Sequence, residues 1–187
     1  QPRSRGLGDV YKRQIIYSAH WDHIGVGEPD ARGDRIFNGA LDNASGTASL
    51  IELARGFAKQ KRPQRSVLFL AVTAEEKGLL GSEYYATHPL YPLEKTVAVI
   101  NMDGMAPFGP SRDFGIYGAA RFELLDQLKD VAKGWDIRYT PDPKPEAGLF
   151  FRSDHFPFAK RGVPALSWSA GQDWVDGGVA AGKKASE

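Results

Sequence analysis

The chain has 187 residues, 42% of them hydrophobic and 25% charged, a balance that suits one globular domain with a sizeable buried core. A formal net charge of +1, with no cluster of Lys and Arg between aromatic residues, argues against nucleic acid as a partner. The lack of cysteine excludes disulfides and thiolate metal ligands, and no apolar run approaches the roughly 18 residues of a membrane-spanning helix, so we expect no membrane segment in this chain.

The two ends of the chain carry no clear structural pattern. Residues 1–14, QPRSRGLGDVYKRQ, are basic and show no hydrophobic period, and we expect them to be a non-native leader. The last residues, GGVAAGKKASE, stop without a cap or a closing element. We therefore predict a single domain over residues 15–187 that is truncated at both ends and has lost any signal peptide.

Short apolar runs alternate with helical patterns between these ends. We expect buried strands at residues 15–19, 67–73, 97–101 and 165–168. Apolar side chains recur at helical spacing over residues 45–59 and 121–133, and Asn43 and Ser45 are available as caps for the first of these helices. Shorter helical turns are expected at 82–87 and 153–159, and the Pro-rich stretch 140–148 is expected to be a loop.

Strands this apolar are typical of a sheet whose two faces are both covered by helices. The sequence therefore predicts an α/β fold with a largely parallel sheet covered by helices on both faces. Ligands in such folds gather outside the carboxyl ends of the strands. Three expected strands end just before a candidate metal ligand: His20 follows the first, Glu75 and Glu76 follow the second, and Asp103 follows the third.

These residues, together with Asp42 and His155, form an ordered series of carboxylates and imidazoles. Such a mixture favours zinc or a similar first-row metal, because calcium sites use oxygen alone and structural zinc usually takes thiolates. A lone His or Asp after a strand is more often an ordinary hydrogen-bonded residue. The recurrence of all of them in one chain favours a two-metal hydrolase.

Five strings carry a more specific signal: HWDH, LDNASG, TAEEKGLLGS, NMDG and SDH, in this order. Each string is weak alone, but the series resembles the zinc peptidases of family M28, which include dinuclear aminopeptidases. The resemblance covers about residues 15–169. It implies a zinc-exopeptidase-like fold, a peptide substrate, and a periplasmic or secreted location.

The resemblance also implies a role for each matching residue. It implies two zinc ions, or two other divalent first-row metals, bridged by the carboxylate of Asp42. Glu76 and His155 would complete one metal site. His20 and Asp103 would complete the other. Glu75 would be the general base that takes a proton from water and passes it to the leaving amine. The peptide bond from Asp42 to Asn43 is expected to be cis.

Asp22 lies two residues beyond His20, and the resemblance implies that its carboxylate orients the His20 ring. The alternative is an aspartate that caps a turn. Members of the family commonly carry a Tyr-His pair near the carboxyl end that helps to hold the oxyanion, and no such pair follows Trp174 in this sequence. The sequence therefore leaves the oxyanion-stabilising residue unassigned.

Other residues near these motifs receive weaker assignments. We expect His23 to support the site through its neighbour Asp22 rather than to bind metal. His88, which precedes Pro89, is expected to end a surface helical turn, and Asp154 is expected to cap the helix that follows it. Four phenylalanines near His155 belong either to the core or to a substrate pocket: Phe150, Phe151, Phe156 and Phe158.

The expected function is that of a metallo-aminopeptidase, which hydrolyses the peptide bond next to a free amino terminus. A carboxypeptidase-type relative is an open alternative. Glutaminyl-cyclase-type relatives use one zinc, so the second ligand pair of His20 and Asp103 argues against them. A non-catalytic binding module would have lost ligands, whereas this sequence keeps all five together with Glu75.

Overall fold

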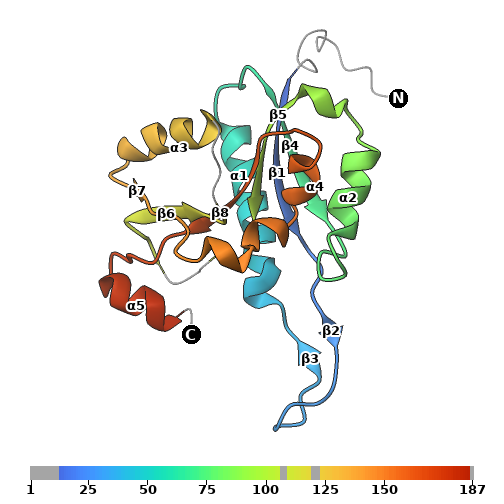
Figure 1. Ribbon diagram of the computed structural model, residues 1–187, viewed down its shortest axis with the longest axis vertical. Coiled ribbons are helices and arrows are strands. Elements are labelled where there is room, and N and C mark those ends of the chain that lie inside the picture. The colour runs from blue at the N-terminus through green and yellow to red at the C-terminus, as the bar shows by residue number, and fades with distance from the viewer. Residues whose placement is uncertain (1–12, 106–108, 119–122, 186–187) are drawn as a thin grey trace.

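Six strands form the main sheet of the computed structural model, which describes residues 13–105, 109–118 and 123–185 (Figure 1). Their order across the sheet is β4-β1-β5-β8-β6-β7, so β1 lies between two strands that follow it much later in the chain. The strands are β1 (Gln14–His20), β4 (Ser66–Val72), β5 (Thr96–Met102), β6 (Asp113–Ile116), β7 (Arg138–Tyr139) and β8 (Ala165–Ala170).

Most neighbouring strands of this sheet run parallel. β1 is parallel to β4 and to β5, β5 is parallel to β8, and β6 is parallel to β7. β6 and β8 pair antiparallel, so β6 and β7 run in the opposite direction to the other four strands. Parallel neighbours need long crossover connections, and helices supply most of them here.

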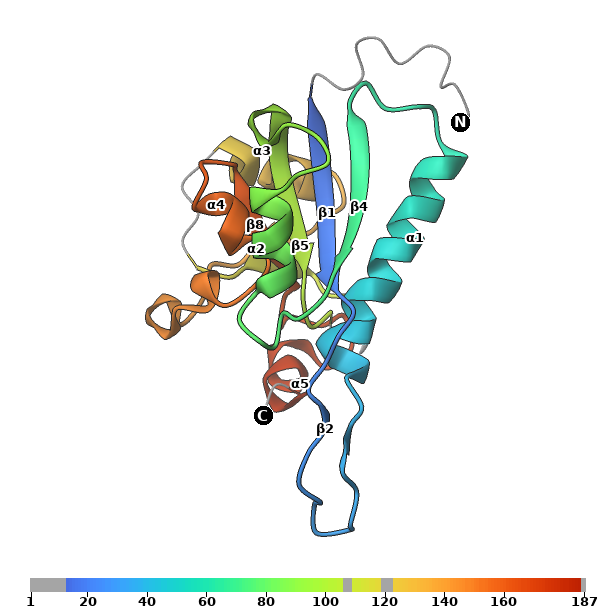
Figure 2. The ribbon, with the colours of Figure 1, turned by 90° about the vertical axis from the view of Figure 1, so that its right-hand side faces the viewer.

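The helices cover both faces of the sheet (Figure 2). α1 (Gly46–Lys59) lies on one face, and α2 (Leu80–Thr87) and α4 (Phe156–Ala159) lie together on the other. α3 (Glu123–Lys133) packs beside β7, and α5 (Gly178–Ala185) is the last helix. The predicted α/β fold, with a largely parallel sheet and helices on both faces, is therefore confirmed.

The central strands are mostly apolar because each face of the sheet has its own core. Val99 of β5 packs in a cluster with Phe158 of α4, which has no exposed surface. The next residue, Ile100, points to the opposite face and packs in a second cluster with Leu125 of α3. This alternation along one strand follows from the two-residue period of side chains in a sheet.

A separate antiparallel ribbon joins β1 to the rest of the chain. It consists of β2 (Gly25–Val26) and β3 (Ile36–Phe37), and it extends from the end of the sheet at which β1 terminates (Figures 1 and 2). The Asp30 carboxylate closes its turn by accepting the backbone N–H groups of Arg32 and Asp34, at 2.8 and 2.9 Å. This ribbon was not predicted, because its two-residue strands are too short to show a period.

The expected elements agree with the observed ones to within about three residues. The helix predicted at 121–133 is observed at Glu123–Lys133, and positions 121–122 lie outside the described residues. β6, β7 and α5 were not predicted. The expected loop at 140–148 contains the short 3-10 turn Pro145–Ala147, and two further 3-10 turns lie at Leu93–Lys95 and Leu149–Phe151.

Within the described residues, no helix combines the length and the apolarity that crossing a bilayer requires.

Candidate metal centre

Most of the predicted site residues lie at the carboxyl ends of three neighbouring strands. His20 is the last residue of β1, Asp103 directly follows β5, and Glu75 and Glu76 follow β4 in the loop before α2. Because β1 lies between β4 and β5, the loops that leave these strands emerge side by side. Asp42 reaches the same place from a π-helical turn, Ala40–Ser45, that leads into α1.

A first group of ligand atoms surrounds the Nε2 atom of His20. This atom lies 3.1 Å from Asp42 Oδ1 and 3.2 Å from Asp103 Oδ1. Ligand atoms about 2.1 Å from a tetrahedral zinc ion lie about 3.4 Å from one another, so the observed separations fit such an ion with little adjustment. His20 is fully buried, and its other ring nitrogen, Nδ1, lies 3.0 Å from the Asp22 backbone oxygen. One ring nitrogen is therefore held by the backbone while the other faces two carboxylates.

A second group contains Asp42 again, now with Glu76 and His23. His23 Nδ1 and Glu76 Oε1 are 2.7 Å apart. The Asp42 side chain, which is 51% exposed, is thus shared between two sets of potential ligands and remains open to solvent. A carboxylate shared in this way can hold a pair of divalent cations.

His155, the ligand predicted to accompany Glu76, belongs to neither group. Its ring is fully buried and stands edge-on to Phe150, with ring centroids 4.8 Å apart, and neither ring nitrogen has a hydrogen-bond partner. The structure places His23 beside Glu76 instead. HWDH contained the signal for His23, since a second histidine follows the first by three residues, but we expected it only to support the site.

Ser153, from the SDH string, acts on the centre through Asp103. Its hydroxyl donates to Asp103 Oδ2 at 2.7 Å and accepts a hydrogen bond from Asn101 Nδ2 at 2.6 Å. Asn101 Oδ1 in turn accepts from Ser18 Oγ of β1 at 2.8 Å. This buried chain of hydrogen bonds fixes which oxygen of Asp103 faces His20. No role for Ser153 was predicted from the sequence.

Asp42 is held in place by its neighbour Asn43, which is buried. Asn43 Nδ2 donates to the Met102 backbone oxygen at 3.0 Å, and its Oδ1 accepts the Gly46 N–H at 2.9 Å. These bonds tie the turn before α1 to the end of β5 and confirm Asn43 as a cap for α1. Ser45 occupies the N-cap position of α1, as predicted, but its side chain makes no capping bond. The Asp42–Asn43 peptide bond is cis, as expected.

Asp22 links the ends of β1 and β4. Its Oδ1 accepts the backbone N–H of Glu75 at 3.3 Å and lies 3.7 Å from His20 Nδ1. The closer contact to the His20 ring comes from the Asp22 backbone oxygen. The carboxylate predicted to orient His20 therefore also positions the backbone of Glu75.

The β4–α2 loop turns sharply to bring the two glutamates to the centre. Ala74 and Leu79 have left-handed backbone angles, with φ of 57° and 61°. The backbone oxygen of Glu75 accepts the N–H groups of Gly78 and Leu79, each at 2.9 Å. α2 can start this close to β4 because residue 81 is glycine: a Cβ atom there would lie 2.3 Å from the Thr73 backbone oxygen.

Crowded acidic groups shift several pKa values. Burial raises the pKa of Glu75 to about 8, and the charges of Asp103 and Asp154 add to that rise while His20 opposes it. Burial also raises the pKa of Asp42, and the charge of Asp103 reinforces it. Burial opposes protonation of His20, but the hydrogen bond and charge of Asp103 outweigh it and raise the His20 pKa to about 9. A bound divalent cation would favour the ionised carboxylates and lower their pKa values.

Asp154 and His155 are adjacent residues, and both are fully buried. Burial raises the pKa of Asp154 to about 6 and lowers the pKa of His155 to about 4. Neither carboxylate oxygen of Asp154 makes a hydrogen bond that caps α4, and His155 itself occupies the N-cap position. The predicted cap by Asp154 was therefore wrong.

The four phenylalanines near His155 divide between two environments. Phe158 is fully buried in the core and contacts Tyr85, with ring centroids 6.0 Å apart. The other three pack edge to face, with centroid distances of 5.2 to 6.1 Å. Phe151 is 59% exposed. His88 lies on the surface and stacks on Tyr84, in agreement with its predicted position.

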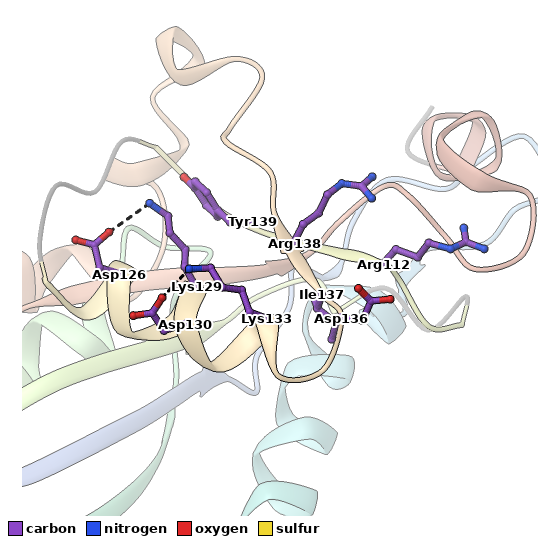
Figure 3. Close-up of a pocket in the computed structure, with 9 residues that line it drawn as sticks. All are labelled: Arg112, Asp126, Lys129, Asp130, Lys133, Asp136, Ile137, Arg138 and Tyr139. Atoms are coloured by element: carbon purple, nitrogen blue, oxygen red, sulfur yellow. Dashed lines mark hydrogen bonds and ion pairs between the residues drawn. The ribbon is translucent and has the colours of Figure 1, made fainter.

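A cavity of about 600 Å³ between α3 and β7 lies among residues other than the predicted ligands (Figure 3). Its lining mixes basic side chains with aspartates, and two of these pairs are in contact: Lys129 with Asp126 at 3.4 Å, and Lys133 with Asp130 at 2.8 Å. Pairs this exposed are typical of a solvated helix surface.

The chain is similar to known proteins of one peptidase family. The model of peptidase family M28 matches residues 5–184. The protein named aminopeptidase NAALADL1 of Mus musculus is 33% identical over 160 residues, which are 73% of this chain and 19% of that protein. The probable glutamate carboxypeptidase of Arthroderma benhamiae is 29% identical over 181 residues, which are 84% of this chain and 25% of that protein.

A similar fold occurs in a solved structure, the LapA aminopeptidase of Legionella pneumophila. It superposes with a TM-score of 0.68 at 22% sequence identity, covering 87% of this chain and 42% of that chain. This likeness concerns the fold alone. The chain spans about a fifth to a quarter of the length of the two curated relatives above.

Proposed function

This chain belongs to peptidase family M28, and we propose that it is a dinuclear zinc exopeptidase whose two metal ions share the carboxylate of Asp42. The observation that carries the proposal is the place of Asp42 in two groups of ligand atoms at the carboxyl ends of the strands. An aminopeptidase is the leading form of this activity, supported by the name of the Mus musculus relative. We also propose a periplasmic or secreted location, supported by the family resemblance.

The donor chemistry of the two groups suits zinc or a similar first-row metal. One side would be formed by His20 and Asp103 and the other by Glu76, with Asp42 between them. When bound, the two ions would polarise the scissile carbonyl and lower the pKa of a water molecule. Imidazole and carboxylate ligands without thiolates are typical of such catalytic sites.

Glu75 is the residue that we propose as the general base. Its partly buried side chain follows β4 directly before Glu76, and a glutamate positioned in this way can take a proton from water. Asp22 accepts the Glu75 N–H and so holds its backbone, while Glu76 turns toward His23. The two adjacent glutamates thereby take separate roles, one moving a proton to the leaving amine and the other binding metal.

The test compares the parent chain with Glu75→Gln and with Glu94→Gln, a control on an exposed glutamate. Metal content is measured by elemental mass spectrometry, and turnover is measured on chromogenic aminoacyl substrates. We expect two metals in all three proteins and a loss of nearly all turnover in Glu75→Gln alone. Unchanged turnover in Glu75→Gln would remove this residue from the mechanism, and a parent chain that binds fewer than two ions would overturn the dinuclear proposal.

A carboxypeptidase is the second candidate, favoured by the probable glutamate carboxypeptidase among the relatives. Both activities would use the same metals and the same base, so the centre itself does not distinguish them. Peptides blocked at one terminus do. Hydrolysis of an amidated peptide with a free amino terminus supports the aminopeptidase, whereas hydrolysis of an acetylated peptide with a free carboxyl terminus supports the carboxypeptidase.

A further inference from the structure

We propose that Phe37 of the β2–β3 ribbon is a specificity-determining residue, which binds an apolar side chain of the peptide on the leaving-group side of the scissile bond. The inference rests on the proposed aminopeptidase activity and names the part of the substrate that the ribbon selects. It starts from the place of the ribbon in the chain. β2 follows His20 of the centre, and β3 leads through Gly39 to Asp42, so both ends of the ribbon are fixed at the candidate centre.

Phe37 lies close to the centre through its contact with His23. The two rings are tilted by 59°, with their centroids 6.5 Å apart. His23 Nδ1 in turn lies 2.7 Å from Glu76 Oε1, at the end of β4. The Phe37 ring therefore lies on the side of the ribbon that adjoins Glu76, where the side chain of a peptide held at the centre can reach it.

Two glycines leave the backbone of the ribbon open beside Phe37. A Cβ atom at residue 27 would lie 2.6 Å from Phe37 Cε2, so the ring rests against the Gly27 backbone. Gly25 pairs with Phe37 across the ribbon, and a Cβ atom there would meet no other atom within 4 Å. Glycine in a strand often marks a place where a ligand or another backbone approaches closely. The ribbon thus offers free space next to an aromatic ring of fixed position.

The exposure of Phe37 indicates which part of a substrate it meets. Its ring is packed against His23 and Gly27, yet the residue remains 45% exposed. An aminopeptidase binds a chain that ends on one side of the scissile bond and continues on the other. The ribbon extends away from the sheet into solvent, so a chain that passes Phe37 can continue outward (Figure 2). An exposed aromatic ring favours an aromatic or aliphatic side chain at this position.

Three substrates test the proposal: leucyl-phenylalanyl-glycine, leucyl-seryl-glycine and leucine amide, which has no residue after the scissile bond. We expect the parent to hydrolyse the phenylalanyl peptide with a kcat/KM about three- to tenfold above that of the seryl peptide. Phe37→Ala should abolish this preference and leave the hydrolysis of leucine amide unchanged, and Phe37→Leu should keep most of it. Trp135→Ala, at a residue that is 77% exposed after α3, is the matched control and should keep the parent preference.

Two further measurements separate binding from turnover. Gly27→Ala keeps Phe37 but displaces its ring, so the preference for the phenylalanyl peptide should fall in this variant as well. Analogues of the two peptides with CH2–NH in place of the scissile amide bind without hydrolysis, and calorimetry measures their affinity for the protein supplied with zinc. We expect Phe37→Ala to weaken binding of the phenylalanyl analogue about three- to tenfold and to leave binding of the seryl analogue unchanged.

The same preference in the parent and in Phe37→Ala, with both folded by circular dichroism, would overturn the proposal. A change of oligomeric state in Phe37→Ala, measured by light scattering, would also overturn it, because Phe37 would then belong to a contact between copies of the chain. A parent that hydrolyses none of the three substrates would instead overturn the proposed aminopeptidase activity. The affinities of the two analogues would still decide whether Phe37 binds an apolar side chain.

Discussion

Replacing Ser153 by alanine tests whether the SDH string acts on the metal centre through Asp103. The Ser153 hydroxyl donates to the ionised carboxylate at 2.7 Å, and a hydrogen bond to a charged group contributes about 1.5–3 kcal/mol. The change also removes the closest acceptor of Asn101 Nδ2, at 2.6 Å, although Ser167 Oγ remains at 3.4 Å. Together these losses predict that Ser153→Ala lowers the free energy of unfolding by about 3 kcal/mol at pH 7.

The pH dependence of this loss has a definite sign. Burial would raise the pKa of Asp103, but the hydrogen bonds from His20 and Ser153 outweigh it and lower the pKa below its ordinary value of 3.8. A depressed carboxyl pKa stabilises the folded state above the unfolded pKa, and that contribution disappears as the pH falls through the folded value. The difference between Ser153→Ala and the parent should therefore shrink below about pH 4.

Urea unfolding followed by circular dichroism, with chelator present, measures this difference at pH 7 and pH 3. Ser49→Ala is the matched control, because the Ser49 hydroxyl donates to the Ser45 carbonyl within the helical region and alanine is a good helix former. We expect the control to lie within about 0.5 kcal/mol of the parent. A Ser153→Ala variant equally close to the parent at pH 7 would refute the reasoning. Its zinc affinity, measured separately, should fall about 10- to 100-fold.

Three further changes test the surrounding fold by urea unfolding. Gly46→Ala should destabilise the protein by about 1–3 kcal/mol, because the new Cβ would lie 2.4 Å from the Met102 backbone oxygen; the gain in stability that helix propensity alone predicts would contradict this. Phe158→Ala should cost about 3–5 kcal/mol, since its ring is fully buried between α4 and the sheet, and a loss below about 1 kcal/mol would show that the site is loosely packed. Glu83→Gln should lower the free energy of unfolding by about 1 kcal/mol at pH 7 and by less at pH 2, because hydrogen bonds from Arg161 and Lys160 lower the Glu83 pKa to about 2. An equal loss at both pH values would show that the ion pairs are not its cause.

The local sequence contained enough information to predict the core of the fold. Strands such as β4 are continuous apolar runs because helices cover both of their faces, and this pattern is visible without coordinates. The outer strands β6 and β7 could not be predicted in this way. β7 has two residues and β6 has four, so their place in the sheet depends on pairing with β8 and with each other. Such pairing partners lie far away in the chain and leave no local period.

The candidate centre, like the fold, could be predicted only in part from the sequence. The sequence by itself determined that His20, Glu76 and Asp103 each follow a strand, and the carboxyl ends of parallel strands open at one edge of a sheet. That these three strands are neighbours was decided by the tertiary structure. Only the tertiary structure decided which second imidazole faces Asp42. His23 reaches it through the close approach of Gly39, whereas the packing of Phe150 holds His155 inside the core. Ligand type is a property of each residue, but ligand position depends on contacts between segments that are distant along the chain.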